Sequence, residues 1–177
     1  MEAAQIHSVG ECEAVEGFGH RWLAAWNEHD VEALVWQCTE DVTLEDPALP
    51  EALHGHDGVR RFAQATFCAF PDLQITELEP PYVSTAGPKA LSLYRFTATM
   101  EGPWEPTGIA ATGARIDFRG IDEWELREGR LARYRATYNL LEVARQMGVL
   151  PRHGSLADRI LARLQHVQAQ LQRRRRG

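Results

Sequence analysis

Hydrophobic residues in the first part of the chain recur at helical spacing. A helix is predicted over residues 11–29, where one apolar stripe is formed by Val15, Phe18, Trp22, Leu23 and Trp26. Asp30 is expected to begin a short second helix that runs through Cys38. A third helix is predicted from Gly55 or Asp57 to about Phe70, where Pro71 ends it.

The later part of the chain alternates between apolar and polar residues, as strands do. Strands are predicted over residues 41–46, 73–79, 90–100, 114–127 and 130–141. Because helices come first and most strands follow, the pattern indicates an α+β fold. In this fold the three N-terminal helices pack on one face of a strongly curved, mainly antiparallel sheet.

Two aspartates interrupt the apolar faces of their strands. Residues i and i+2 of a strand share a face, so Asp122 lies on the same face as Trp124, and Asp46 on the same face as Leu44. A bare buried carboxylate costs several kcal/mol, so each must be paired, protonated or solvated. Two acids that face one apolar cavity are typical of acid–base chemistry: one takes a proton and the other, held neutral, donates a hydrogen bond.

Each aspartate also has a purely structural interpretation. Asp46 precedes Pro47 and could be a simple turn or cap residue. Asp122 could form a buried ion pair with Arg95 or Arg135. An enzyme requires instead that both carboxylates face one cavity of roughly 300 Å³ or more, with neither of them turned to solvent or locked to an arginine.

Composition and charge indicate one globular body with a basic appendage. The chain has 177 residues, 44% of them hydrophobic and 25% charged, which excludes a disordered chain. Residues 152–177 hold seven arginines and one acid, Asp158, so this segment carries +6 of a net charge of −6 and the rest carries −12. An acidic body argues against a core that binds nucleic acid. We expect a flexible N-terminus over residues 1–10, one domain over 11–151, and a basic amphipathic helix with an arginine tail over 152–177.

The tail has several interpretations. Its apolar residues are spaced by three and four, as in about two heptads of a coiled coil: Ala157, Ile160, Leu164, Val167 and Leu171. It could pair with a second copy, lie across its own body or, through the arginine run 173–176, contact nucleic acid or an anionic membrane surface. A frayed, solvated end is the plain alternative.

The cysteines indicate a reducing compartment. Cys12, Cys38 and Cys68 are odd in number, widely spaced and without a CxxC motif, which favours free thiols. No secretory signal and no membrane-spanning run is visible in the sequence. The expected location is the cytoplasm.

One stretch resembles the ketosteroid isomerases of the nuclear-transport-factor-2-like superfamily. The segment EDVTLEDPALPEALHGHDGVRRF (Glu40–Phe62) is similar to their strand, loop and helix, and their general base corresponds to Asp46. Gly120-Ile121-Asp122, followed by Glu128-Gly129-Arg130-Leu131, resembles their second aspartate strand. The resemblance implies that Asp122 is a protonated oxyanion-hole acid.

Other segments resemble the SnoaL-like polyketide cyclases of the same superfamily. They are Trp26–Leu34, Phe70–Leu73 and Ala111–Pro151, so the resemblance spans roughly residues 15–151. It implies a cone-shaped α+β barrel around an apolar pocket. The C-terminal helical extension predicted from spacing and charge lies beyond the segment that the resemblance covers. The isomerases' oxyanion-hole tyrosine aligns with Trp22 and their supporting tyrosines with Cys38 and Ala63, so the tuning network of that family is expected to be missing. The cyclase His and Asp align with Tyr134 and Ala136.

The predicted site combines these residues. Asp46 and Asp122 are the expected catalytic pair; the expected substrate-binding residues are Trp22, Trp26, His54, Phe62, Tyr94, Tyr134 and Tyr138. No cofactor and no metal are expected, although His54 and His56, with Asp46 or Asp57, form a weak candidate metal set whose alternative is a polar loop.

The predicted function is a small-molecule isomerase or cyclase. An aspartate base would abstract the proton alpha to a carbonyl of an apolar polyketide-, terpenoid- or steroid-like substrate. A homodimer is the expected assembly. The alternative is a non-catalytic ligand-binding or dimerisation module of the same fold, because a fold does not decide function.

Overall fold

The computed structural model describes residues 9–85, 87 and 89–176. Most of the segment 1–10, predicted to be flexible, lies outside the described residues. The first three helices are α1 (Val9–Asn27), α2 (Val31–Trp36) and α3 (Gly55–Ala69). Asp30 begins α2 as predicted, since its Oδ1 accepts a hydrogen bond from the Ala33 N–H at 2.9 Å. The predicted end of this helix is wrong: it stops at Trp36, and Cys38 already belongs to the first strand.

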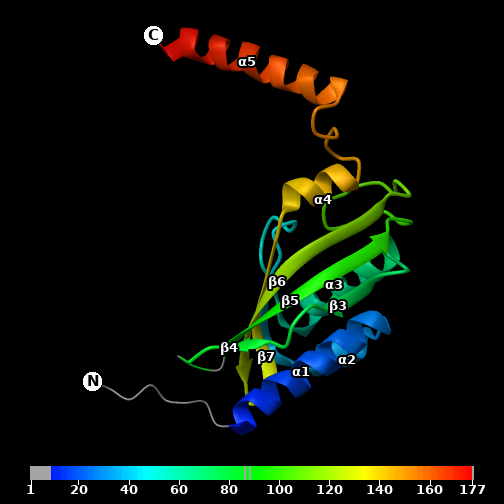
Figure 1. Ribbon diagram of the computed structural model, residues 1–177, viewed down its shortest axis with the longest axis vertical. Coiled ribbons are helices and arrows are strands. Elements are labelled where there is room, and N and C mark those ends of the chain that lie inside the picture. Colours follow the sequence, from blue (N-terminus) through cyan, green and yellow to red (C-terminus); the bar gives the residue numbers. More distant parts are fainter. Residues whose placement is uncertain (1–8, 86, 88, 177) are drawn as a thin grey trace.

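The strands form one curved sheet (Figure 1). They are β1 (Cys38–Glu45), β2 (Leu53–His54), β3 (Gln74–Glu77), β4 (Tyr82–Val83), β5 (Lys89–Thr99), β6 (Arg115–Arg127) and β7 (Arg130–Tyr138). Their order is β2-β1-β7-β6-β5-β3, with β4 beside β5. All pairings are antiparallel except β1 with β7. Glu128 and Gly129 join β6 to β7 with φ of 53° and 75°, as a two-residue hairpin turn of type I′ requires.

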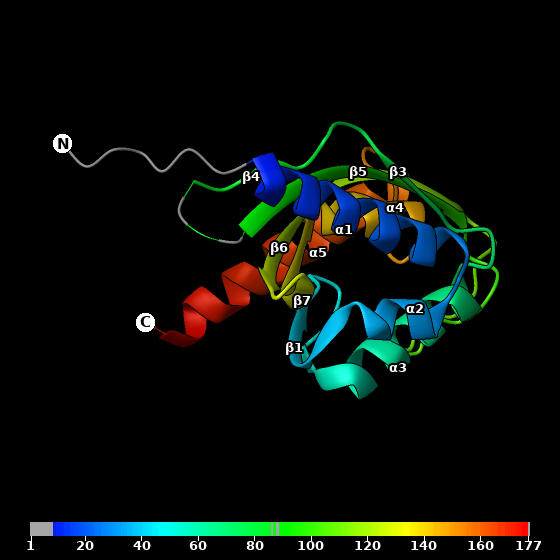
Figure 2. The same cartoon turned by 90° about the horizontal axis from the view of Figure 1, so that it is seen from below.

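The helices cover the concave face of the sheet (Figure 2). On β6 the even positions face inward, and Ile116 and Trp124 among them are each 1% exposed. The odd positions face outward and, apart from Ile121, carry charges. Phe18 and Trp22 of α1 pack against this face: the rings of Phe18 and Trp124 meet edge to face with centroids 5.2 Å apart. The predicted α+β class is confirmed, and the arrangement is consistent with a cone.

Two helices follow the sheet. α4 (Leu140–Gln146) was not predicted, and residues 139–141 are wrong as the end of a strand. Asn139 ends β7 because its side chain caps α4 by accepting the Glu142 N–H at 3.1 Å, a bond that competes with strand pairing.

α5 (Leu156–Arg176) stands apart from the body beyond α4 (Figure 1). It carries the apolar residues that the heptad pattern singled out, but the side chains of Val167 and Leu171 lie outside the described residues. Within the described part of the chain, no helix is both long and apolar enough to span a bilayer.

Candidate active site

The concave side of the sheet and the helices around it enclose a cavity of about 290 Å³. Aromatic side chains form much of its wall: Trp22, Trp26, Phe62, Phe70, Phe96, Trp104 and Phe118. The apolar side of α4 adds Leu140, Val143, Ala144 and Met147. Among the described residues, Asp46 and Asp122 are the only charged ones in this wall. An apolar cavity with few polar groups is the usual form of a small-molecule site.

Asp46 follows the last residue of β1 and faces the cavity. Leu44, on the same face, is 1% exposed, and the parallel pairing of β1 with β7 brings the ends of the two strands together. The Asp46 Oδ1 accepts hydrogen bonds from the Tyr138 hydroxyl and the Ala48 N–H, both at 2.8 Å. Asp46 is therefore a turn residue and a cavity residue at once. Burial raises the pKa of its carboxyl, and the two hydrogen bonds oppose that rise.

Asp122 lies deeper, on the buried face of β6, with 7% of its surface exposed. Its Oδ1 accepts a hydrogen bond from the Tyr134 hydroxyl at 2.8 Å, and the Tyr94 hydroxyl is a second partner. Burial raises the pKa of this carboxyl well above its usual range. The charge of Asp46 raises this pKa further, and the two hydroxyls lower it. Burial thus favours the protonated form of Asp122 more strongly than that of Asp46.

Three tyrosines of the sheet hold the two acids. Ala136 lies opposite Asp122 in the β6–β7 pairing, so its neighbours Tyr134 and Tyr138 flank the acid on the inward face of β7. Tyr134 bonds to Asp122 and Tyr138 to Asp46. Burial raises the pKa of each tyrosine, so the hydroxyls stay protonated and donate. A tyrosine network is therefore present, but it comes from β5 and β7 and not from the positions of Cys38 and Ala63.

Gly120 makes room for Tyr94. The two residues are opposite one another in the β5–β6 pairing, and a Cβ at Gly120 would overlap with both Cζ and the hydroxyl oxygen of Tyr94. Tyr94 is only 5% exposed and packed by its neighbours. The absence of a side chain on Gly120 thus lets the Tyr94 hydroxyl reach Asp122.

We predict that Gly120→Ala pushes the Tyr94 ring out of place and lowers the free energy of unfolding by about 1–3 kcal/mol, as overpacking does. The loss should appear as a Tm lower by about 2–4 °C for each kcal/mol. The control is Tyr94→Phe, which removes the hydroxyl and keeps the ring, followed by thermal unfolding and near-UV circular dichroism. An unchanged Tm and tyrosine spectrum in Gly120→Ala would contradict this packing.

The structure places six of the seven expected substrate-binding residues in the cavity wall: Trp22, Trp26, Phe62, Tyr94, Tyr134 and Tyr138. The Trp22 ring is 5.9 Å from that of Tyr134, in the position that the resemblance gives to an oxyanion-hole donor. Sequence reasoning missed the α4 residues and Trp104, which follows β5 in the loop to β6. These residues are hard to recognise in the sequence, because an apolar residue in a short helix or a loop does not belong to a long periodic pattern.

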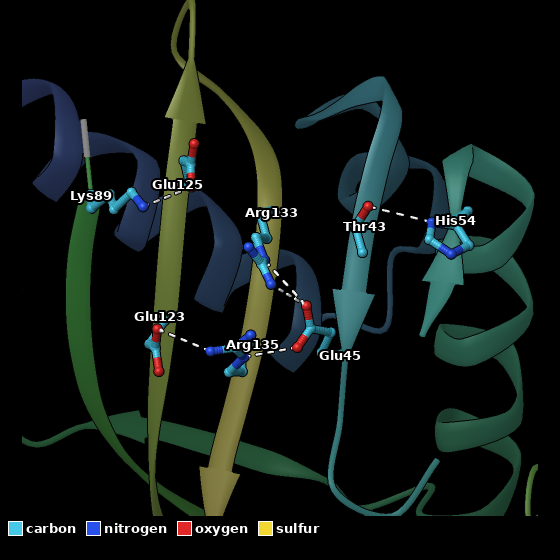
Figure 3. A network of polar contacts seen from close by, with 8 residues as sticks. All are labelled: Thr43, Glu45, His54, Lys89, Glu123, Glu125, Arg133 and Arg135. Atoms are coloured by element: carbon cyan, nitrogen blue, oxygen red, sulfur yellow. Dashed lines mark hydrogen bonds and ion pairs between the residues drawn. The ribbon is translucent and has the colours of Figure 1, made fainter. Parts of the chain in front are cut away.

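His54 lies away from the cavity, on the outer side of the sheet (Figure 3). It is exposed, and its Nδ1 is 3.3 Å from the Thr43 hydroxyl, so its position gives no support for a contact with substrate. The arginines proposed as partners of Asp122 also face outward. Arg135 pairs with Glu45 at 2.8 Å, and Arg95 pairs with Asp117 at 2.6 Å. The partners of Asp122 are tyrosines instead.

The weak candidate metal set is not assembled. His56 contacts the Cys38 carbonyl oxygen at 3.2 Å, while His54 bonds to Thr43 and Asp46 to Tyr138. Among the residues that the structure describes, no group of three His, Cys, Asp or Glu side chains is placed to hold a metal ion.

Comparisons with known proteins agree with this fold. The family model of the SnoaL-like domain matches residues 20–134. Among solved structures, TsrD from Streptomyces laurentii is 28% identical, with a TM-score of 0.66 over 78% of this chain and 97% of that one. A protein assigned as a SnoaL-like polyketide cyclase from Jannaschia sp. CCS1 is 20% identical, with a TM-score of 0.69 over 83% and 99%.

A third similar structure, from Catenulispora acidiphila, has a ketosteroid isomerase-like fold and was solved with trimethylamine. It is 17% identical, with a TM-score of 0.62 over 74% and 92% of the two chains. The second and third likenesses show the fold alone. No curated protein matches the sequence. Because the family model covers more than half of the chain, this protein belongs to the SnoaL-like domain family, within the nuclear-transport-factor-2-like superfamily.

Proposed function

We propose that the protein is an isomerase or cyclase that removes the proton alpha to a carbonyl group. The observation that carries the proposal is the pair of carboxyls in one apolar cavity, each bonded to its own tyrosine. Among the residues that the structure describes, no arginine bonds to either carboxyl. The cavity, at about 290 Å³, is close to the lower limit of small-molecule pockets, about 300 Å³.

The two acids take different roles because their surroundings differ. Asp46 is at the edge of the cavity, where the Ala48 N–H and the Tyr138 hydroxyl stabilise its charge, so it serves as the base. Asp122 is more deeply buried and the Asp46 charge disfavours its ionisation, so it serves as a neutral donor. The hydroxyls of Tyr134 and Tyr94 hold the Asp122 carboxyl in place.

The reaction moves one proton at a time. The carboxylate of Asp46 takes the α-proton, and the electrons of the C–H bond move onto the carbonyl oxygen to form an enolate. The protonated Asp122 donates a hydrogen bond to that oxygen, with Trp22 beside it. In an isomerisation, Asp46 then returns its proton to another carbon. In a cyclisation, the enolate carbon attacks a second carbonyl, and the alkoxide that forms takes the proton back from Asp46. These steps use no cofactor.

The wall of the cavity indicates the class of substrate. Its side chains are mostly aromatic and aliphatic, and its two carboxyls lie on the sheet. We propose an apolar substrate with a carbonyl at one end, of the polyketide, terpenoid or steroid type. Burial of its rings against Trp26, Phe62 and Phe118 supplies binding energy of about 25 cal/mol per Å².

Exchange with solvent deuterium tests the proposal without knowledge of the product. Loss and return of an α-proton in D₂O adds deuterium to a ketone even when the reaction goes no further. We expect the protein to accelerate this exchange in at least one member of a panel of apolar ketones, measured by mass spectrometry. Tight binding of such ketones, seen as quenching of tryptophan fluorescence, with no accelerated exchange would instead support a ligand-binding module.

We also propose that the protein is a homodimer that pairs through the outer face of the sheet. That face carries interleaved charges, including Arg133 and Arg135 of β7, which both pair with Glu45 of β1 (Figure 3). Reversing one charge by Arg135→Glu should shift the mass in sedimentation from dimer to monomer. Arg61→Glu, on exposed α3 surface, is the control and should leave the mass unchanged. A monomeric wild type, or a dimer that Arg135→Glu does not affect, contradicts this assignment.

The thiols are in keeping with the cytoplasm as the proposed location. Cys38 and Cys68 are both free. The Cys38 thiol is buried and donates to the Leu34 carbonyl oxygen at 3.3 Å, and burial raises its pKa to about 12. Such a thiol stays protonated and acts as a small core residue.

A further inference from the structure

Helix α5 presents an apolar face that the body does not cover. The exposed fractions of its side chains are 75% for Leu156, 49% for Ile160, 49% for Leu161 and 62% for Leu164. Figure 1 shows the helix projecting beyond α4 and away from the sheet. The proposed active site does not use it.

The exposed residues form one stripe along the helix. Steps of three and four positions keep side chains on one face, and Ala157, Ile160, Leu161 and Leu164 follow these steps. Val167 and Leu171 continue the same spacing in the sequence. Arg159 and Arg163 fall outside the stripe, so the helix is apolar on one side and basic on the other.

The charge of residues 152–177 indicates which kind of partner α5 binds. Residues 152–177 hold seven arginines and one aspartate, so two copies of α5 repel one another, and two heptads are short for a coiled coil. An anionic partner is favoured. Nucleic acid would match the arginines but leave the leucines in water, whereas an anionic bilayer offers phosphates to the arginines and acyl chains to the stripe.

We propose that α5 lies flat on an anionic lipid surface and tethers the body to it. Its 21 residues form a rod of about 32 Å, long enough for the whole stripe to enter the boundary between headgroups and acyl chains. The body carries −12 and is itself repelled by such a surface. Because α5 is set off beyond α4 (Figure 1), the body is held away from the surface, and salt screens the repulsion over roughly 8–10 Å.

Co-sedimentation of the full chain with lipid vesicles tests the proposal. Vesicles of phosphatidylcholine with phosphatidylglycerol should bind the protein, and vesicles of phosphatidylcholine alone should bind it at least about tenfold less tightly. Added salt should weaken the binding to the anionic vesicles. Equal binding to both vesicles, or binding to neither, overturns the proposal.

Two matched variants separate the contribution of the apolar stripe to vesicle binding from the contribution of charge. Leu164→Glu places a carboxylate in the stripe, and Ala162→Glu places the same charge on the polar side of the helix. Leu164→Glu should weaken vesicle binding at least about tenfold more than Ala162→Glu does. Equal effects of the two variants would mean that charge alone binds, and the flat insertion would be wrong.

Sedimentation velocity without vesicles tests the rival proposal, in which α5 pairs with a second copy of the chain. If Leu164→Glu, but not Ala162→Glu, lowers the mass of the protein, α5 pairs with a second copy and the lipid proposal is overturned. An unchanged mass supports it. Because α5 projects from the body, both variants should keep the Tm of the wild type. The vesicle and sedimentation results do not depend on whether the proposed enzymatic reaction is correct.

Discussion

Asp46→Asn should slow deuterium exchange into a responsive ketone by about 10²–10⁴-fold, the usual contribution of a positioned general base. The substitution keeps the shape of the side chain, and the amide oxygen can still accept the Tyr138 hydroxyl and the Ala48 N–H. What it removes is the ability to take a proton. The loss should therefore appear in kcat, with little change in the affinity for substrate.

Glu45→Gln is the matched control for this variant. Glu45 is the preceding residue and also an acid, but it faces outward and pairs with Arg133 and Arg135. Glu45→Gln removes one carboxylate charge, as Asp46→Asn does, but one position away and on the other face of β1. We expect exchange at the rate of the wild type. Equal rates for Asp46→Asn and the wild type would remove Asp46 from the chemistry.

The pH profile adds a second test of the same residue. Burial raises the pKa of Asp46 above the usual value of an aspartate, and only the ionised carboxylate takes the α-proton. Activity should fall as the pH drops through this raised pKa, so the acid limb lies at a higher pH than an aspartate of ordinary pKa would give. Asp46→Asn should lack that limb.

Asp122→Ala should slow the exchange by about 10²–10³-fold, the usual effect of removing one donor to a developing oxyanion. Asp122 lies on the buried face of β6 and its proton has no role in binding the apolar part of the substrate. The loss should again be in kcat. An Asp122→Ala protein that folds and exchanges at the rate of the wild type would exclude Asp122 as the donor.

The stability of Asp122→Asn at different pH values tests whether Asp122 is protonated in the folded protein. In the unfolded chain its pKa is near 3.8, and in the folded protein it is raised well above that value. The folded state therefore holds the proton more tightly. Its contribution to stability is full below the unfolded pKa and is lost as the pH rises through the folded pKa. Asparagine cannot ionise, so the Tm of Asp122→Asn should gain on that of the wild type as the pH is raised.

Asp117→Asn is the control, because the contribution of Asp117 to stability depends on pH in the opposite direction. Asp117 lies on the outward face of the same strand, where the bond from Arg95 lowers its pKa. Its stabilising effect is present above the unfolded pKa and is lost as the pH falls. The variant should therefore not gain on the wild type at high pH. If the two variants respond to pH in the same way, the assignment of Asp122 as a neutral acid is wrong.

The two buried acids lower the stability of the fold. Each acid loses hydration on folding, and tyrosine hydroxyls replace it only in part. A core built for stability alone would place an apolar residue at position 122, between its neighbours on the buried face. The retained carboxyl is therefore itself an argument for function.

The sequence predicted the parts of the fold that depend on local periodicity. The helices α1 and α3, the long strands and the inward direction of Asp46 and Asp122 all follow from spacing along the chain, because side chains repeat every 3.6 or 2 positions. The turn at Glu128-Gly129 follows from local backbone chemistry. The error at residues 139–141 has the same origin: Asn139 can end a strand or cap a helix, and spacing alone does not separate these outcomes.

The sequence by itself thus determined that two acids point into an apolar interior beneath three helices. Only the tertiary structure decided what surrounds them. The register of β5, β6 and β7 gave Asp122 two tyrosines in place of an arginine, the parallel pairing of β1 with β7 gave Asp46 its tyrosine, and α4 closed the wall. These neighbours are far apart in the chain, and pairing and burial choose them through packing that no local pattern records.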